Sequence, residues 1–177
     1  REIIKQIEEY VNVPLHINEV NEKILSNEIV NLKEKEEREK FFAGVMKTHI
    51  SNSLYSFSFG TKDGEYYGAR KNLENEIEIM LNDSSTEGNS WYYSVNDNLT
   101  SKELTTKAGK FDPRTRAWYI AAVENDGPVF APVYKHFVMD DLTLSASIPV
   151  YDNNQKFLGV LGSHITLGRI NQFLEEI

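Results

Sequence analysis

The apolar residues of this chain change their spacing near residue 52, and this change constrains the fold more than any other feature. Before it, Ile3, Ile7 and Val11 mark a repeat of three to four positions, which is the spacing of one helix face. After it, polar and apolar residues alternate in short runs separated by turn-forming residues, which indicates strands. We therefore predict helices over the first third of the 177 residues and a sheet over the remainder.

The first third is predicted to hold one long helix and a second, shorter one. Pro14 lacks an amide hydrogen and crowds the preceding turn, so we expect it to kink or interrupt the long helix. Asn31, with Glu34 three residues later, has the pattern of a capping box, which places the start of the second helix just after residue 31. The buried face of that helix is expected to carry Phe41, Phe42, Val45, Met46 and His49.

Seven later runs have the pattern of strands, and the first is expected to be half-buried because its residues alternate. Asp63-Gly64, between the first two, is the strongest hairpin signal in the chain. A short helix is predicted over 113–125, capped by Asp112, and an amphipathic helix over 169–177 closes the chain. The predicted strands are 54–59, 65–71, 77–81, 91–95, 130–137, 142–151 and 157–167.

These elements predict an α+β fold. Consecutive strands joined by tight turns pair antiparallel, because a parallel pair needs a long crossover. We therefore expect a single antiparallel sheet with helices packed against it. The expected division is an N-terminal helical stalk over 1–51 and a sheet module over 52–177.

Composition excludes several classes of function. Nineteen basic and 27 acidic residues give a net charge of −8, which argues against nucleic acid or an anionic membrane surface as the main partner. The absence of Cys removes disulfide scaffolds, thiolate metal sites and cysteine nucleophiles. No run approaches about 18 apolar residues, so we expect no transmembrane helix within these residues. The start at Arg1, without an initiator Met, suggests a fragment of a longer protein.

Signatures of catalysis are weak. There is no Gly-x-Ser-x-Gly or Ser-x-x-Lys motif and no glycine-rich phosphate loop, so we expect neither an enzyme nor a cofactor. A hydrolase that uses His136 with Asp140 or Asp141 is an alternative. The four histidines show no spacing of metal ligands, so we expect no metal site (His16, His49, His136 and His164).

The densest group of functional side chains lies in 111–119. Arg116 offers a planar fork of donors to an anion, and the free amides of a helix start add positive potential. Trp118 and Tyr119 supply apolar walls with polar tips. The alternative for this segment is structural: one arginine pairs with Asp112 while Trp118 fills the core. Both interpretations stay open at this point.

Two further residues are candidates for the same site. Tyr134 lies on the strand after the short helix. His164 lies in the middle of the strongly apolar last strand, where a polar residue is either a paired structural group or faces a cavity.

The segment and its surroundings resemble Cache sensor domains. Residues 111–122, which contain Asp-Pro-Arg-Thr-Arg-Ala-Trp-Tyr, are similar to the signature of that family. The same order of elements continues through 127–134, 144–152 and 159–165, and the resemblance covers 52–177. It is to the Cache domains of bacterial membrane-bound cyclases, histidine kinases and chemoreceptors. It implies an extracytoplasmic, PAS-like module of a membrane-anchored receptor, namely the membrane-distal module of a double Cache domain behind a long N-terminal helix.

The resemblance also implies a ligand site. In amino-acid-binding members, the Arg and Trp of the signature hold the ligand carboxylate, and Tyr and Asp residues hold its amine. Two acidic positions of that pattern are His164 and Ala121 here, so an ammonium group would lack a buried counter-charge. A small anionic solute, such as a carboxylate, fits better. The predicted ligand-binding residues are Phe111, Arg116, Trp118, Tyr119, Tyr134 and His164.

The expected function is therefore sensing without catalysis. Ligand binding would shift the population between two arrangements of the sheet relative to the N-terminal helix, which would carry the signal as part of a homodimer. The alternative is a ligand-free dimerisation or interaction module whose pocket is filled by its own side chains.

Overall fold

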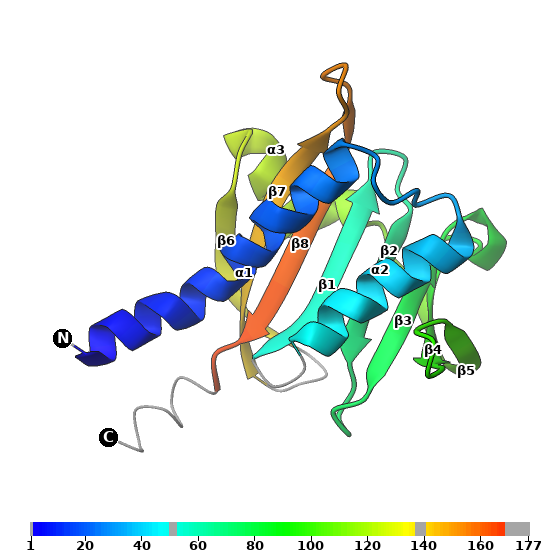
Figure 1. Ribbon diagram of the computed structural model, residues 1–177, viewed down its shortest axis with the longest axis horizontal. Coiled ribbons are helices and arrows are strands. Elements are labelled where there is room, and N and C mark those ends of the chain that lie inside the picture. The colour runs from blue at the N-terminus through cyan, green and yellow to red at the C-terminus, as the bar shows by residue number, and fades with distance from the viewer. Residues whose placement is uncertain (1, 50–52, 137–140, 169–177) are drawn as a thin grey trace.

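Eight antiparallel strands form one sheet in the described part of this computed structural model, which comprises residues 2–49, 53–136 and 141–168. Their order is β5-β4-β3-β2-β1-β8-β7-β6, so the first and last strands of the chain lie side by side within the sheet (Figure 1). Seven of the strands are the predicted ones, and all neighbours are antiparallel. The strands are β1 (Leu54–Thr61), β2 (Tyr66–Lys71), β3 (Ile77–Asn82), β4 (Asn89–Val95), β5 (Ser101–Lys110), β6 (Val129–His136), β7 (Asp141–Tyr151) and β8 (Phe157–Thr166).

The strand β5 is not predicted from the sequence. Nine of its ten residues, 102–110, are exposed, and they show no alternation of buried apolar side chains. The strand is held at the sheet edge by pairing with β4. An edge strand of this kind can be polar on both faces, so the usual signal for a half-buried strand is absent.

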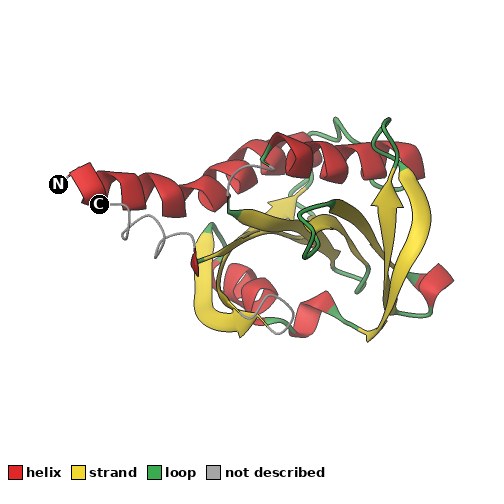
Figure 2. Ribbon diagram, turned by 90° about the horizontal axis from the view of Figure 1, so that it is seen from below, coloured by secondary structure: helices red, strands yellow, loops and turns green. Residues whose placement is uncertain are grey.

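The predicted half-burial of the first strand is wrong, because every residue from Leu54 to Gly60 is buried. Helices lie on both sides of the sheet, so neither face of this inner strand reaches solvent (Figure 2). The register with β8 also shifts between Leu54 and Ser56, which brings Tyr55 within 6.1 Å of His164, ring centroid to ring centroid. A bulge of this kind breaks strict alternation.

Two helices cover one face of the sheet (Figures 1 and 2): α1 (Glu2–Ser26) and α2 (Lys35–Thr48). Ile17, Leu25, Phe42 and Met46 from these helices join the main hydrophobic core with residues of the sheet. No helix in the described ranges combines the length and hydropathy that a membrane crossing requires.

Pro14 does not interrupt α1, which runs unbroken past it, so that part of the prediction is wrong. Pro14 is itself buried, as are Ile17 and Asn18 one turn later. The packing of this half of the helix on the sheet offsets the one backbone hydrogen bond that proline removes.

The predicted capping box at Asn31 and Glu34 is also wrong. The helix α2 begins at Lys35, and Glu34 at its N-cap makes no side-chain capping bond. Asn31 instead caps a turn, because its Oδ1 accepts from the amide of Lys33 at 3.0 Å. Glu37 Oε1 accepts from the amide of Asn31 at 3.0 Å, so only the backward half of such a box forms, from a residue six positions later.

The opposite face carries η2 (Pro113–Thr115) and α3 (Ala117–Asn125), while η1 (Ser84–Thr86) connects β3 to β4. The single helix predicted over 113–125 is split, because Arg116 is extended at φ −84° and ψ 147°. Asp112 caps η2 as predicted, accepting from the amide of Arg114 at 3.0 Å. Gly60 lets η2 approach β1 closely, since a Cβ there would lie 2.7 Å from Pro113 Cβ.

The predicted closing helix over 169–177 lies outside the described residues.

A candidate ligand-binding site between the sheet and α3

The register shows which residues share a sheet face with α3. Ser56 of β1 is paired with Arg70 of β2 on one side and with His164 of β8 on the other. Two residues further along β1, Ser58 is paired with Gly162. Cross-strand partners lie on one face of a sheet, so these side chains form a shared floor.

Trp118 of α3 lies on this floor. Its side chain is buried, and a Cβ at Gly162 would lie 3.2 Å from its Cε3. The backbone carbonyl of Trp118 accepts a hydrogen bond of 2.7 Å from Ser147 Oγ, which fixes the start of α3 on β7. The second predicted wall, Tyr119, is also buried, and its ring meets that of Trp118 at 6.0 Å. Burial raises the pKa of the Tyr119 hydroxyl.

His164 lies beside Trp118 and is buried. The two rings meet edge to face with centroids 5.4 Å apart. His164 Nδ1 is 2.6 Å from Ser145 Oγ, so this hydrogen bond sets the orientation of the imidazole. The His164 side chain therefore lies on the α3 face of the sheet. Of the two predicted alternatives, the hydrogen bond to Ser145 corresponds to a paired group.

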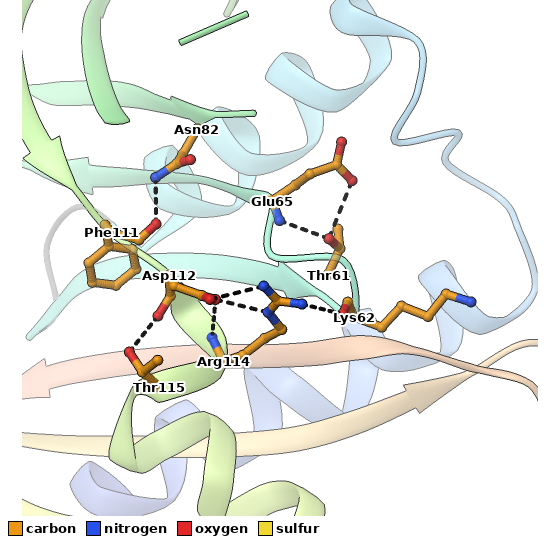
Figure 3. Close-up of polar contacts among 8 residues, drawn as sticks. All are labelled: Thr61, Lys62, Glu65, Asn82, Phe111, Asp112, Arg114 and Thr115. Carbon is orange, nitrogen blue, oxygen red and sulfur yellow. Dashed lines mark hydrogen bonds and ion pairs between the residues drawn. The ribbon is translucent and has the colours of Figure 1, made fainter. Parts of the chain in front are cut away.

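Only one of the two signature arginines is neutralised within the described part of the chain. Arg114 donates to both carboxylate oxygens of Asp112, at 3.0 and 2.9 Å, and to the carbonyl of Lys62 at 3.2 Å (Figure 3). This pair lowers the pKa of the Asp112 carboxyl. The structural alternative therefore holds for Arg114.

Arg116 has a different environment. It is exposed at the N-cap of α3, and its Cζ lies 5.4 Å from the ring centroid of Phe111. No carboxylate of a described residue is within ion-pair distance of it. Phe111 is in turn fixed by Asn82, whose Nδ2 donates to its carbonyl at 3.0 Å (Figure 3), and by a tilted ring contact with Tyr66, whose centroid is 4.7 Å away.

Tyr134 is placed by its backbone alone. Its backbone lies in β6 and is paired with Thr143 of β7, and its side chain lies outside the described part. The same holds for the hydrolase alternative, since Asp140 and the side chains of His136 and Asp141 are not described.

Three polar residues of this face are not predicted from the sequence. Arg70, Glu78 and Tyr92 come from β2, β3 and β4, and Glu78 is buried. The only sequence signal for them is that every second residue of a strand faces the same side of the sheet, and many surface residues share this property. No group of His, Asp and Glu in the described ranges could hold a metal ion.

A long N-terminal helix over one face of an antiparallel sheet, with a short helix and buried aromatic side chains on the other, is the arrangement of a PAS-like fold. The sequence model of the "Methyl-accepting chemotaxis protein-like, first PDC sensor domain" family matches residues 62–172, so the chain belongs to this family.

Solved structures agree with this fold. The ligand-binding domain of the Pseudomonas aeruginosa amino acid chemoreceptor PctC, in complex with GABA, is 16% identical, with a TM-score of 0.58 over 97% of this chain and 64% of that one. The Campylobacter jejuni chemoreceptor Tlp3 with L-valine is 14% identical, with a TM-score of 0.57 over 96% and 56%. A structure named methyl-accepting chemotaxis protein X is 16% identical, with a TM-score of 0.62 over 96% and 60%.

The chain therefore spans somewhat more than half the length of these solved domains. No curated protein sequence matches it.

Proposed function

We propose that this chain is the extracytoplasmic sensor module of a membrane-anchored receptor and that it binds a small solute through a carboxylate. The module would be the membrane-distal one of a double Cache domain. The observation that carries the proposal is Arg116, a guanidinium beside an aromatic cluster with no carboxylate partner among the described residues.

The surroundings of Arg116 suit an anion. The helix α3 begins directly after it, so the free amides of the first turn add positive potential on the same side. Phe111 holds an aromatic ring under the guanidinium, which limits the conformations that the side chain must give up on binding. L-valine and GABA, found in the related chemoreceptor structures, both carry a carboxylate, together with an amine.

An amine is a poorer fit. His164 occupies the strand position where an acidic residue is expected, and it is held by Ser145. The buried acid on this face, Glu78, already accepts from Arg70 at 3.0 Å and from Thr105 at 2.8 Å. An ammonium group would have to compete for those oxygens, and burying it unpaired is costly. The ligand class we favour is therefore a carboxylate without an essential amine.

Transmission would run through β8. His164 faces α3, while its neighbour Ser163 faces α1 and donates to Asn18 Oδ1 at 2.6 Å. A ligand that moves one side of this strand therefore acts on a polar contact to the long helix on the other. It can shift the helix only if it binds two arrangements with different affinity. The division into a stalk over 1–51 and a module over 52–177, and a dimer through the stalk, belong to this proposal.

A thermal-shift screen tests the ligand class. Carboxylates, amino acids and amines are added to the wild type and to Arg116→Ala, and the melting temperature is followed. A ligand at one hundred times its Kd should stabilise the wild type by about 2.7 kcal/mol and the variant much less. A ligand that stabilises both proteins equally would exclude Arg116 as its anchor.

The ligand-free interaction module is the second candidate. It is favoured by the burial of Trp118 and Tyr119 against each other and against Tyr66, which shows that the chain fills much of this face itself. It predicts no stabilisation by any solute in the same screen, together with concentration-dependent association.

A further inference from the structure

A second arginine lies on the α3 face, in a cluster of four side chains from four different strands. Arg70 Nε donates to Glu78 Oε1 at 3.0 Å, and Thr105 Oγ1 donates to Glu78 Oε2 at 2.8 Å. The guanidinium lies flat enough on Tyr92 for its Cζ to be 3.4 Å from the ring centroid. Side chains from β2, β3, β4 and β5 thus meet around the Arg70–Glu78 ion pair.

The terminal nitrogens of this guanidinium are unused. In the described part of the chain, Nε has an acceptor, whereas Nη1 and Nη2 have none. The side chain is only 24% exposed. Neither terminal nitrogen is among the buried, unpartnered polar atoms of the described residues, so both are accessible to water and could donate to a bound acceptor.

The remaining contacts fix the fork in place. Both carboxylate oxygens of Glu78 already accept hydrogen bonds, one from Arg70 and one from Thr105. The carboxylate therefore orients Arg70. Stacking on Tyr92 sets the plane of the guanidinium. A donor group that is held in advance loses little freedom when it binds an anion.

The position of Arg70 links it to the candidate site. Arg70 and His164 are both paired with Ser56, so one strand separates them, which corresponds to about 10 Å between their backbones. Ser56 lies between them, and Ser58 and Gly68 lie beside them on the same face. At Gly68 a Cβ would lie 2.6 Å from the carbonyl oxygen of Phe57 and 2.7 Å from Met80 Cε, so the buried Met80 side chain packs over this glycine.

We propose that Arg70, oriented by Glu78 and Tyr92, is a second anion subsite that selects ligands with a second carboxylate. This inference rests on the proposed function, in which Arg116 binds the first carboxylate. It narrows the ligand class from carboxylates in general to dicarboxylates. The charges of Arg70 and Glu78 cancel. The subsite would therefore bind an anion through the free N–H donors of the guanidinium and not through an excess of positive charge.

The experiment compares dicarboxylates with monocarboxylates. Isothermal titration measures the Kd of succinate and glutarate, and of butyrate, on the wild type, Arg70→Gln and Arg70→Lys. The expected result is that wild type prefers the dicarboxylates, and that Arg70→Gln weakens them by about tenfold or more while leaving butyrate unchanged. Arg70→Lys should recover only part of the loss, because a lysine keeps the charge but not the planar fork.

The matched control is Lys107→Gln. Lys107 Nζ lies 4.5 Å from the ring centroid of Trp91, so this variant removes the same charge and a similar cation–aromatic contact. Trp91 is paired with Leu81, which packs on the α1 and α2 side of the sheet. The affinity for dicarboxylates should therefore stay unchanged in Lys107→Gln.

The outcomes separate the two proposals. If no carboxylate binds the wild type, the proposed ligand class fails and the subsite fails with it. If carboxylates bind through Arg116 but Arg70→Gln has no effect, or weakens butyrate as much as glutarate, only the subsite is overturned. Circular dichroism and thermal melting of Arg70→Gln and Arg70→Lys show whether a loss of binding reflects a loss of fold. Loss of dicarboxylate binding in a variant that remains folded supports the subsite. Loss of binding that is explained by unfolding overturns it.

Discussion

The indole of Trp118 and the imidazole of His164 meet edge to face, with centroids 5.4 Å apart and planes at 77°. Trp118 of α3 packs closely on β8 beside His164 because Gly162 has no side chain there. A Cβ at that position would lie 3.0 Å from His164 Nε2 and 3.2 Å from Trp118 Cε3. The absence of a side chain at one residue of β8 thus sets the geometry of the aromatic part of the site.

Gly162→Ala should displace the indole or the imidazole. We expect the affinity for a carboxylate ligand to fall by about tenfold, equivalent to 1.4 kcal/mol, because both rings border the site. Tryptophan fluorescence in a Trp91→Phe background reports the displacement directly, and titration reports the affinity.

Gly109→Ala is the control for this substitution. A Cβ at Gly109 would meet no atom of a described residue within 4 Å, so neither fluorescence nor affinity should change. Unchanged fluorescence and affinity in Gly162→Ala would show that the rings can move aside without consequence and would contradict this description of the site.

Ser163→Ala should destabilise the contact between α1 and the sheet. Ser163 and Asn18 are both fully buried, and the variant leaves Asn18 Oδ1 without its donor. Its Nδ2 already has no hydrogen-bond partner among the described residues. The expected loss in the free energy of unfolding is about 1–3 kcal/mol, measured by urea denaturation.

A second substitution tests the cause of that loss. Adding Asn18→Leu to Ser163→Ala removes both polar groups, so part of the stability should return. Thr48→Ala, which removes only an exposed bond to Gly44 within α2, should have little effect. If Ser163→Ala alone is as stable as the wild type, the hydrogen bond between Ser163 and Asn18 does not hold α1 on the sheet.

The pair of Asp112 and Arg114 should give a small, pH-dependent contribution to stability. Hydrogen bonding to Arg114 lowers the pKa of Asp112, so the folded state binds that proton less readily than the unfolded state. The contribution is therefore complete above the ordinary aspartate pKa of about 3.9 and is lost as the pH falls through the folded value. The side chains of Arg114 and Asp112 are 45% and 40% exposed, respectively, so solvent screening keeps the contribution of the ion pair small.

Asp112→Asn isolates this effect, because asparagine still caps η2. Urea denaturation should show the wild type slightly more stable than the variant at neutral pH, and this difference should shrink as the pH is lowered below about 3.9. A difference that is independent of pH would mean that the ion pair is not its source.

Most of the fold could be predicted from the sequence because its strands are bounded by strong turn signals. The Asp63-Gly64 hairpin forms as expected, with the amide of Gly64 donating to the carbonyl of Thr61 at 3.0 Å. The errors arose where tertiary contacts override local rules. Pro14 is kept within α1 by packing on the sheet, and Arg116 leaves the helical conformation because η2 docks on Gly60.

The site was only partly predictable for the same reason. Trp118 and His164, which are 46 positions apart, could both be predicted as candidates because the motif and the last strand are each distinctive, and their rings lie 5.4 Å apart. Arg70, Glu78 and Tyr92 carry no motif, and their grouping depends on the register of three strands. Which of Arg114 and Arg116 pairs with Asp112 likewise depends on the split of the predicted helix.

The most direct test of the account is the affinity of a carboxylate ligand for three proteins: wild type, Arg116→Gln and Arg114→Gln. The two variants remove the same charge two residues apart, but only Arg114 is already paired with an acid. Isothermal titration should show at least about a tenfold loss of affinity in Arg116→Gln and near-wild-type binding in Arg114→Gln. Equal losses in the two variants, or no loss in Arg116→Gln, would contradict the proposal that Arg116 binds the ligand.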